Sequence, residues 1–298
     1  MTDTDDTPIP YMQRTRDWYL ALGFGNPYVW AQNDDIPFTK PSKPISQSAL
    51  TLITTAAPYD PEKGDQGPGA PYNAAAKFYK VYSGDMRQDH DLRVSHVAID
   101  RDHTTMTDPG SWFPLPALRA VEGSLFGSLT PRFHGLPTNR SQRHTLEVDA
   151  PEILRRCRED GAEAALFVPN CPVCHQSATL VARHLEAAGI PTLIMGSARD
   201  IVEHAGPPRF LFSDFPLGNA AGKPHDPDSQ AETLALALRL FDTTSGPGQT
   251  QVNPQVWAET ADWKRDYCNT ESRTEEEMAQ LRAKAHADRE VARQVRET

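Results

Sequence analysis

The chain has 298 residues, a net charge of −10 and an ordinary globular composition, with 38% hydrophobic and 23% charged residues. This composition excludes disorder of the whole chain, and the length suits one large domain or two smaller ones. No apolar stretch reaches the roughly 18 residues that a membrane-spanning helix needs. The acidic surplus argues against nucleic acid as a partner. An acidic N-terminus and only four cysteines predict a cytoplasmic protein without a secretory signal or a disulfide framework.

Residues 1–145 are predicted to form an N-terminal α/β half that opens with an aromatic, proline-rich segment. The order of apolar and β-branched residues predicts a helix, three strands and a second helix at Arg14–Leu22, Ala49–Ala56, Lys80–Ser83, Leu92–Ile99 and Leu115–Val121.

Residues 146–244 show a cleaner alternation of helices and short apolar strands. Strands are expected at Ala164–Val168, Thr192–Met195 and Phe210–Phe215. The helices between and around them are expected at Pro151–Asp160 with Asp149 as N-cap, after Cys174, at Asp200–Ala205 and at Ser229–Phe241. This order predicts an α/β fold with a parallel, Rossmann-like sheet covered on both faces, built as two similar halves with the site between them.

Residues 245–298 form a predicted C-terminal extension. The polar stretch 245–256 is interpreted as a linker, and Thr274 and Glu277 occupy the N-cap and N3 places of a capping box that starts a last helix. This helix is expected to lie on the body or on a second subunit, which makes a homodimer one option.

Cys171 and Cys174 form a Cys-x-x-Cys motif between a predicted buried strand and the N-terminus of a helix. The unpaired N–H groups of a helix N-terminus stabilise a thiolate there, and a second cysteine three residues on can resolve a product as a disulfide. The pattern therefore favours redox or nucleophilic chemistry. Two alternatives remain open: a zinc or iron ion held by the pair with histidines, or two inert buried thiols.

A second cluster lies in the stretch DHDLRVSHVAIDRDHT and comprises His90, His96, Asp100, Asp102 and His103. Strand alternation places His96 on one face of the predicted strand Leu92–Ile99, with Asp100 and His103 just past its end. Proton transfer or substrate contact, metal binding, and a solvated loop with capping residues are the three interpretations of this cluster.

Four segments of the chain are distinctive: VPNCPVCHQSATLVARHLEAAGIPTL, SHVAIDRDHT, PLPALRAVEGSLFGSLTPRFHG and PPRFLFSDFPLGNAAGKP. Together they resemble the selenoprotein B family of glycine, sarcosine, betaine and D-proline reductases. The resemblance covers roughly residues 80–242 and more loosely residues 8–60. In that family a selenocysteine precedes a cysteine by three positions at the start of the same helix. Cys171 matches the selenocysteine, Cys174 matches the cysteine, and Ser177 stands where some members carry a third cysteine.

The resemblance implies reductive cleavage of a carbon–nitrogen bond next to a carboxylate, with sulfur in place of selenium. We therefore expect a cysteine-dependent oxidoreductase that acts on a small polar substrate and cleaves a C–N or C–S bond, with Cys171 as nucleophile and Cys174 as resolving thiol. The residues assigned to substrate binding are His96, Asp100, His103, Asn170 and Ser177.

The source of electrons follows from the motifs that the sequence lacks. Neither a G-x-G-x-x-G nor another dinucleotide fingerprint occurs, so no bound cofactor is expected and an external thiol or a thioredoxin-like protein is the expected reductant. Two rival functions stay open: a zinc or iron enzyme with Cys171, Cys174 and a histidine as ligands, and a non-catalytic redox subunit of a larger reductase complex.

Overall fold

The computed structural model describes residues 6–94 and 96–297. Within them, one eight-stranded sheet runs in the order β10-β9-β8-β7-β1-β6-β3, with β5 beside β1. All its neighbouring strands are parallel except β3 and β6, which are antiparallel. The strands are β1 (Ala49–Thr54), β3 (Tyr82–Asp85), β5 (Ser128–Leu129), β6 (Arg132–Gly135), β7 (Ala164–Val168), β8 (Thr192–Gly196), β9 (Arg209–Phe212) and β10 (Gln249–Val252).

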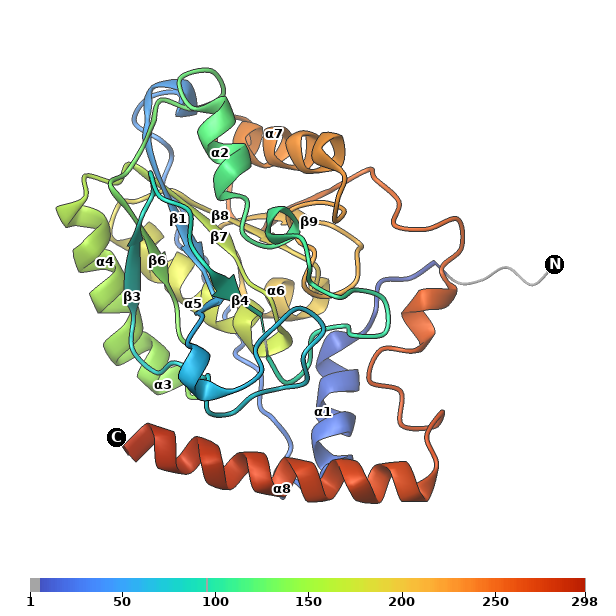
Figure 1. The fold of residues 1–298 in the computed structure, drawn as a ribbon. Coiled ribbons are helices and arrows are strands. Elements are labelled where there is room, and N and C mark those ends of the chain that lie inside the picture. Colours follow the sequence, from blue (N-terminus) through green and yellow to red (C-terminus); the bar gives the residue numbers. More distant parts are fainter. Residues whose placement is uncertain (1–5, 95, 298) are drawn as a thin grey trace.

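Helices cover both faces of this sheet, which confirms the predicted Rossmann-like α/β class (Figure 1). They are α1 (Tyr11–Ala21), α2 (Leu115–Val121), α3 (Gln142–His144), α4 (Ala150–Glu159), α5 (Pro172–Ala187), α6 (Arg199–Ala205), α7 (Pro227–Thr243) and α8 (Glu275–Glu297). None of the helices in the described part of the chain is both long and apolar enough to cross a lipid bilayer.

The apolar strand β7 shows why the sheet is covered twice. Leu166 faces a core shared with α2 and α7, whereas Phe167 faces a second core shared with α4, α5 and α6. Successive side chains of a strand point to opposite faces, so a strand buried on both faces is apolar at every position. Residues 1–145 and 146–244 meet here, because β1 of the first half pairs with β7 of the second. The two halves therefore share one sheet instead of each closing its own.

Three local predictions were wrong, each for a physical reason. The strand predicted over Leu92–Ile99 includes residue 95, which lies outside the described residues; the described part forms a strand at β4 (Leu92–Arg93) alone, which pairs with β2 (Ala57–Pro58) in a separate ribbon. Beyond it, the carbonyl of His96 accepts a hydrogen bond from the Arg101 guanidinium instead of from a neighbouring strand. His96 consequently lies in a loop that a side chain holds in place.

The second correction concerns the start of α4. Asp149 does not cap it, because helical backbone already runs through a π-helical turn, Thr145–Asp149, from α3. The cap is Ser141, whose hydroxyl oxygen accepts from the backbone N–H of His144.

The third correction lies in the predicted linker 245–256, which contains the strand β10. Its residues are largely exposed, and as an edge strand it pairs only with β9. It therefore needs no apolar pattern. The capping box at Thr274 and Glu277 is confirmed by hydrogen bonds in both directions between the two residues.

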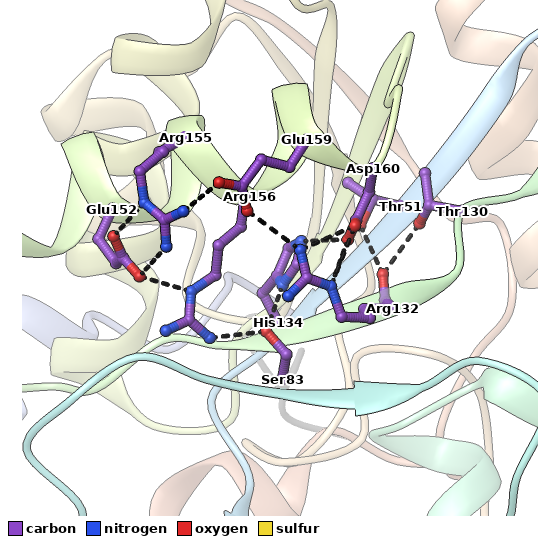
Figure 2. Close-up of polar contacts among 10 residues, drawn as sticks. All are labelled: Thr51, Ser83, Thr130, Arg132, His134, Glu152, Arg155, Arg156, Glu159 and Asp160. Atoms are coloured by element: carbon purple, nitrogen blue, oxygen red, sulfur yellow. Dashed lines mark hydrogen bonds and ion pairs between the residues drawn. The ribbon is translucent and has the colours of Figure 1, made fainter.

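A polar cluster joins α4 to the β6–β3 side of the sheet (Figure 2). At its centre His134, on β6, shares a hydrogen bond of 2.9 Å with the Ser83 hydroxyl through Nδ1 and lies 3.5 Å from Asp160 through Nε2. Arg156 donates to the same Ser83 oxygen at 2.7 Å, and Arg132 donates to Asp160. The cluster fastens the antiparallel edge strand to the helix layer.

Candidate active site

The cysteine motif lies at the carboxyl end of β7, at the first turn of α5. Cys171 is the N-cap, with extended backbone, and Pro172 follows at N1, where a missing N–H costs nothing. The two cysteines form a disulfide with their Cα atoms 4.9 Å apart, and the Cys174 N–H donates to the Cys171 sulfur at 3.2 Å. The sequence prediction of a cysteine pair at a strand-to-helix junction therefore matches the observed geometry.

The two sulfurs have different surroundings. Cys171 is 7% exposed and lines a small cavity, whereas Cys174 is fully buried. A reagent or substrate in the cavity meets Cys171 first, and Cys174 lies behind it. This asymmetry is the arrangement that a nucleophile and a resolving thiol require.

His96 is the predicted residue that the fold brings to the cysteines. One of its ring nitrogens and both sulfurs lie within 4.8 Å of one another. Nε2 shares a hydrogen bond of 2.9 Å with the Thr55 carbonyl; since a carbonyl only accepts, Nε2 carries the proton and Nδ1 keeps a free lone pair. Burial lowers the pKa of His96 to about 4, so the ring is neutral at pH 7.

Asn170 and Ser177 lie on either side of the pair along the chain, and both are buried. The backbone N–H of Asn170 donates to the Thr55 hydroxyl at 3.0 Å, which ties the loop before Cys171 to the end of β1. Within the described residues, the side-chain amide of Asn170 has no hydrogen-bond partner. Ser177 lies inside α5 and is not among the residues that line the cavity at Cys171.

Asp100 and His103 form a pair of their own. His103 Nδ1 lies 3.0 Å from the buried Asp100 carboxylate, and its Nε2 lies 3.3 Å from Asp266. Burial raises the pKa of Asp100. Asp100 borders a second, larger cavity, whereas His103 packs against Trp263 of the C-terminal segment. Of His96, Asp100 and His103, which were predicted together, only His96 belongs to the group of ring nitrogen and sulfurs at the cysteines. Asp100 and His103 form a separate pair.

The space beside Cys171 is cationic. The small cavity, of about 50 Å³, opens beside a larger one of about 710 Å³. Lys77 and Arg140 line both. Burial, with a smaller contribution from Arg140, lowers the pKa of Lys77 to about 8, and Arg140 lies over the ring of Tyr19 at 4.2 Å. Two cations in a partly desolvated site of a chain with net charge −10 favour an anionic ligand.

The long helix α8 runs along one side of the body, next to α1 (Figure 1), and several of its residues line the larger cavity. The Tyr79 hydroxyl donates to the carbonyl of Ala292 at 3.0 Å, and Arg289 donates to the carbonyl of Gly23. A few polar contacts therefore hold this helix against the body, and most of its side chains stay exposed.

Sequence reasoning missed four residues of the site: Thr55, Lys77, Arg140 and His175. His175 Nδ1 donates to the Cys171 carbonyl at 2.7 Å and its Nε2 accepts from the Ser197 N–H at 3.0 Å, so the ring holds the Cys171 backbone in place. His175 directly follows Cys174 in the run Cys-Pro-Val-Cys-His and is buried. A histidine next to the cysteine motif was the signal that the sequence offered for it. Thr55, Lys77 and Arg140 lie in distant segments, and no spacing along the chain indicates that they meet.

A protein from Acetoanaerobium sticklandii named D-proline reductase subunit gamma is 29% identical over 213 residues, which cover 68% of this chain and 85% of that protein. The chain is therefore similar, over most of its length, to a protein named as a subunit of a proline reductase. The resemblance predicted from the segments around Cys171 is thereby confirmed.

The other two comparisons found nothing. No protein-family profile matches the chain, and no solved structure matches it. The reductase relationship is therefore carried by the sequence match, and the site geometry comes from this structure alone.

Proposed function

We propose that this reductase relative cleaves a C–N bond, or a C–S bond in a sulfur analogue, next to the carboxylate of a small substrate. The observation that carries the proposal is the asymmetric pair: Cys171 borders a cationic cavity, and Cys174 lies buried behind it within bonding distance. A nucleophile with a resolving partner converts a difficult two-electron reduction into a displacement at carbon followed by a displacement at sulfur.

The first step forms a bond between the Cys171 sulfur and the substrate carbon and breaks the carbon–nitrogen bond. The amine leaves with a proton from solvent. In the second step the Cys174 thiolate attacks the Cys171 sulfur, the carbon–sulfur bond breaks, and the carbon takes up a proton. The substrate gains two electrons and the pair becomes a disulfide, which is the state of Cys171 and Cys174 in this structure.

The fold supports the Cys171 thiolate in two ways. Its sulfur accepts the Cys174 N–H at the start of a 16-residue helix, where the helix dipole favours negative charge. The His175 ring holds the Cys171 carbonyl, so the N-cap geometry stays fixed when the disulfide opens. His96 is neutral and acts as a hydrogen-bonding wall of the cavity, not as a source of positive charge.

Lys77 and Arg140 bind the substrate carboxylate in this proposal. Both line the cavity at Cys171, and charge-assisted hydrogen bonds to a carboxylate are about twice as strong as neutral ones. Reduction of the disulfide requires an external thiol or a thioredoxin-like protein. D-proline is the first substrate to test, because the relative is named for it.

Trapping the covalent intermediate tests the proposal. A Cys174→Ser variant keeps the nucleophile and loses the resolving thiol, so the reaction stops after the first displacement. The variant is reduced, incubated with D-proline or with an N-methylated acyclic amino acid, and examined by mass spectrometry of the intact chain. A ring substrate adds its whole mass because the amine stays tethered, whereas an acyclic substrate adds its mass less the amine.

The controls separate chemistry at Cys171 from unspecific alkylation. Cys171→Ser and the double variant Cys171→Ser/Cys174→Ser should give no adduct, and Cys157→Ser should behave as the parent because the Cys157 thiol is buried and its pKa is raised to about 12. No adduct on Cys174→Ser with any α-amino carboxylate tested, or an adduct that survives loss of Cys171, contradicts the proposal.

A non-catalytic redox subunit is the second candidate, favoured by the name of the relative, which is one subunit of an enzyme. In that case the isolated chain would cycle between dithiol and disulfide with a thiol reductant but would form no substrate adduct. Adding the adduct assay to a thiol–disulfide titration of the same preparation distinguishes the two functions.

A further inference from the structure

The cluster of His96, Cys171 and Cys174 has a second chemical capacity. It offers one imidazole nitrogen and two sulfurs, all within 4.8 Å of one another. Nitrogen and thiolate sulfur are the donors that zinc prefers, and three protein ligands with a fourth position open is an established zinc arrangement.

The distances are close to those that an ion would need. With zinc–sulfur bonds of about 2.3 Å and a zinc–nitrogen bond of about 2.0 Å, tetrahedral geometry sets the two sulfurs about 3.8 Å apart and each sulfur about 3.5 Å from the nitrogen. When the disulfide opens, the sulfurs separate by van der Waals repulsion toward that spacing. The nitrogen needs to move by only about 1 Å from the present upper limit of 4.8 Å.

The groups around the cluster already orient the ligands. Thr55 accepts the Nε2 proton of His96, which is the outer contact that fixes the tautomer of a metal-binding histidine and leaves Nδ1 free. The Cys174 N–H donates to the Cys171 sulfur, and His175 holds the Cys171 carbonyl. These contacts order two of the three ligands before any ion arrives.

We propose that the reduced protein binds one zinc ion through Cys171, Cys174 and the imidazole of His96. Each thiol loses its proton to solvent on binding. Since Cys171 and His96 line the cavity and Cys174 is buried, the fourth position is left for water or for an anionic group in the cavity. Zinc and the disulfide exclude each other, so the ion protects the reduced pair and blocks Cys171 as a nucleophile.

This inference shares the cysteine pair with the proposed reductase chemistry but does not depend on it. The full chain is reduced and freed of metal under anaerobic conditions, then titrated with zinc against a chromophoric chelator. Cobalt(II) serves as a second probe, because its visible spectrum reports tetrahedral thiolate coordination. One ion per chain is expected in the reduced protein, and none at the cysteines of the oxidised protein.

Variants of His96 decide whether the histidine is a ligand. His96→Ala should weaken zinc binding at least about tenfold, whereas His103→Ala, from the neighbouring pair, should leave it unchanged. His96→Cys guards against misfolding of the alanine variant: it should restore binding and shift the cobalt spectrum toward three thiolates.

Either of two results overturns the inference: zinc affinity that is the same in wild type, His96→Ala and His96→Cys, or zinc that remains at the pair after oxidation to the disulfide. Failure of the reductase proposal would show instead as a missing substrate adduct on metal-free Cys174→Ser. The metal readout and the adduct readout therefore fail independently.

Discussion

Two buried histidines of this fold are in nearly the same electrostatic condition and have different roles. Burial lowers the pKa of both His96 and His134 to about 4. His134 lies within a polar network, with a hydrogen bond to Ser83 at Nδ1 and the Asp160 carboxylate 3.5 Å from Nε2 (Figure 2). His96 gives one nitrogen to Thr55, and its ring borders two sulfurs and a cavity.

The difference shows that a perturbed pKa alone does not identify a functional group. In the network around His134, Ser83 and Asp160 are engaged by the Arg156 donation to Ser83 and the Arg132 donation to Asp160, whereas His134 Nε2 is buried and has no hydrogen-bond partner among the described residues. Around His96, a ring lone pair, the Cys171 sulfur and two cations border a cavity that a ligand can enter. Available capacity next to a cavity, and not the size of the shift, marks the site.

The largest expected effect on activity comes from removing the Cys171 sulfur, which lies beside His96. Cys171→Ser should lower reductive activity by roughly 10³-fold or more, because a hydroxyl at this position is not ionised at neutral pH. Ser83→Ala removes one polar atom from the network around His134. It should lower the free energy of unfolding while turnover per folded chain stays unchanged. Comparable activity in Cys171→Ser and wild type, measured with the substrate that the adduct assay identifies, would place the chemistry elsewhere.

The next effect concerns the cations. Lys77→Met should raise KM by roughly 10- to 100-fold, since a hydrogen bond to a charged group contributes about 1.5–3 kcal/mol. Because only protonated lysine binds an anion, and burial lowers the pKa of Lys77 to about 8, substrate affinity should fall as the pH rises through about 8. Lys77→Arg keeps its charge at that pH and should bind with a flat profile between pH 7 and 9. An unchanged pH profile in Lys77→Arg would show that another group controls binding.

The sequence predicted the regular part of the fold well and the site only in part. The strand Ala164–Val168 and the helix Leu115–Val121 were placed with the observed bounds, because an apolar run and an amphipathic run each carry their own signal. The pairing of Cys171 and Cys174 at a helix start matches the structure because spacing and helix start are local features of the sequence, whereas their chemistry stays a prediction. His96 was chosen correctly as a neighbour, although the strand invoked to position it ends at Arg93.

The rest of the site depends on contacts between distant segments. Thr55 is hydrogen-bonded to Asn170, 115 positions away in the sequence, and to His96, 41 positions away. No local sequence pattern indicates contacts at such separations. Asp100 and His103 were grouped with His96 because they are close in the chain, but a carboxylate three residues before a histidine pairs with it locally. Proximity along the sequence therefore predicted the Asp100–His103 pair correctly but did not predict that this pair lies apart from His96.

The smallest expected effect concerns His134, the other histidine of the comparison. His134→Asn should make unfolding less sensitive to acid. The folded-state pKa of His134 is about 4, below the usual 6.5 of an unfolded chain, so the unfolded state binds a proton first as the pH falls. The stability that neutral His134 contributes is fully present above pH 6.5 and is lost toward pH 4, by about 2 kcal/mol between pH 7 and pH 5. Urea unfolding of wild type and His134→Asn at both pH values measures the difference directly, with Cys171 alkylation at pH 7 expected to be equal in the two proteins. If wild type and His134→Asn were equally sensitive to acid, His134 would already be charged within its network, beside Asp160. The two histidines would then differ in charge and not only in available lone pairs.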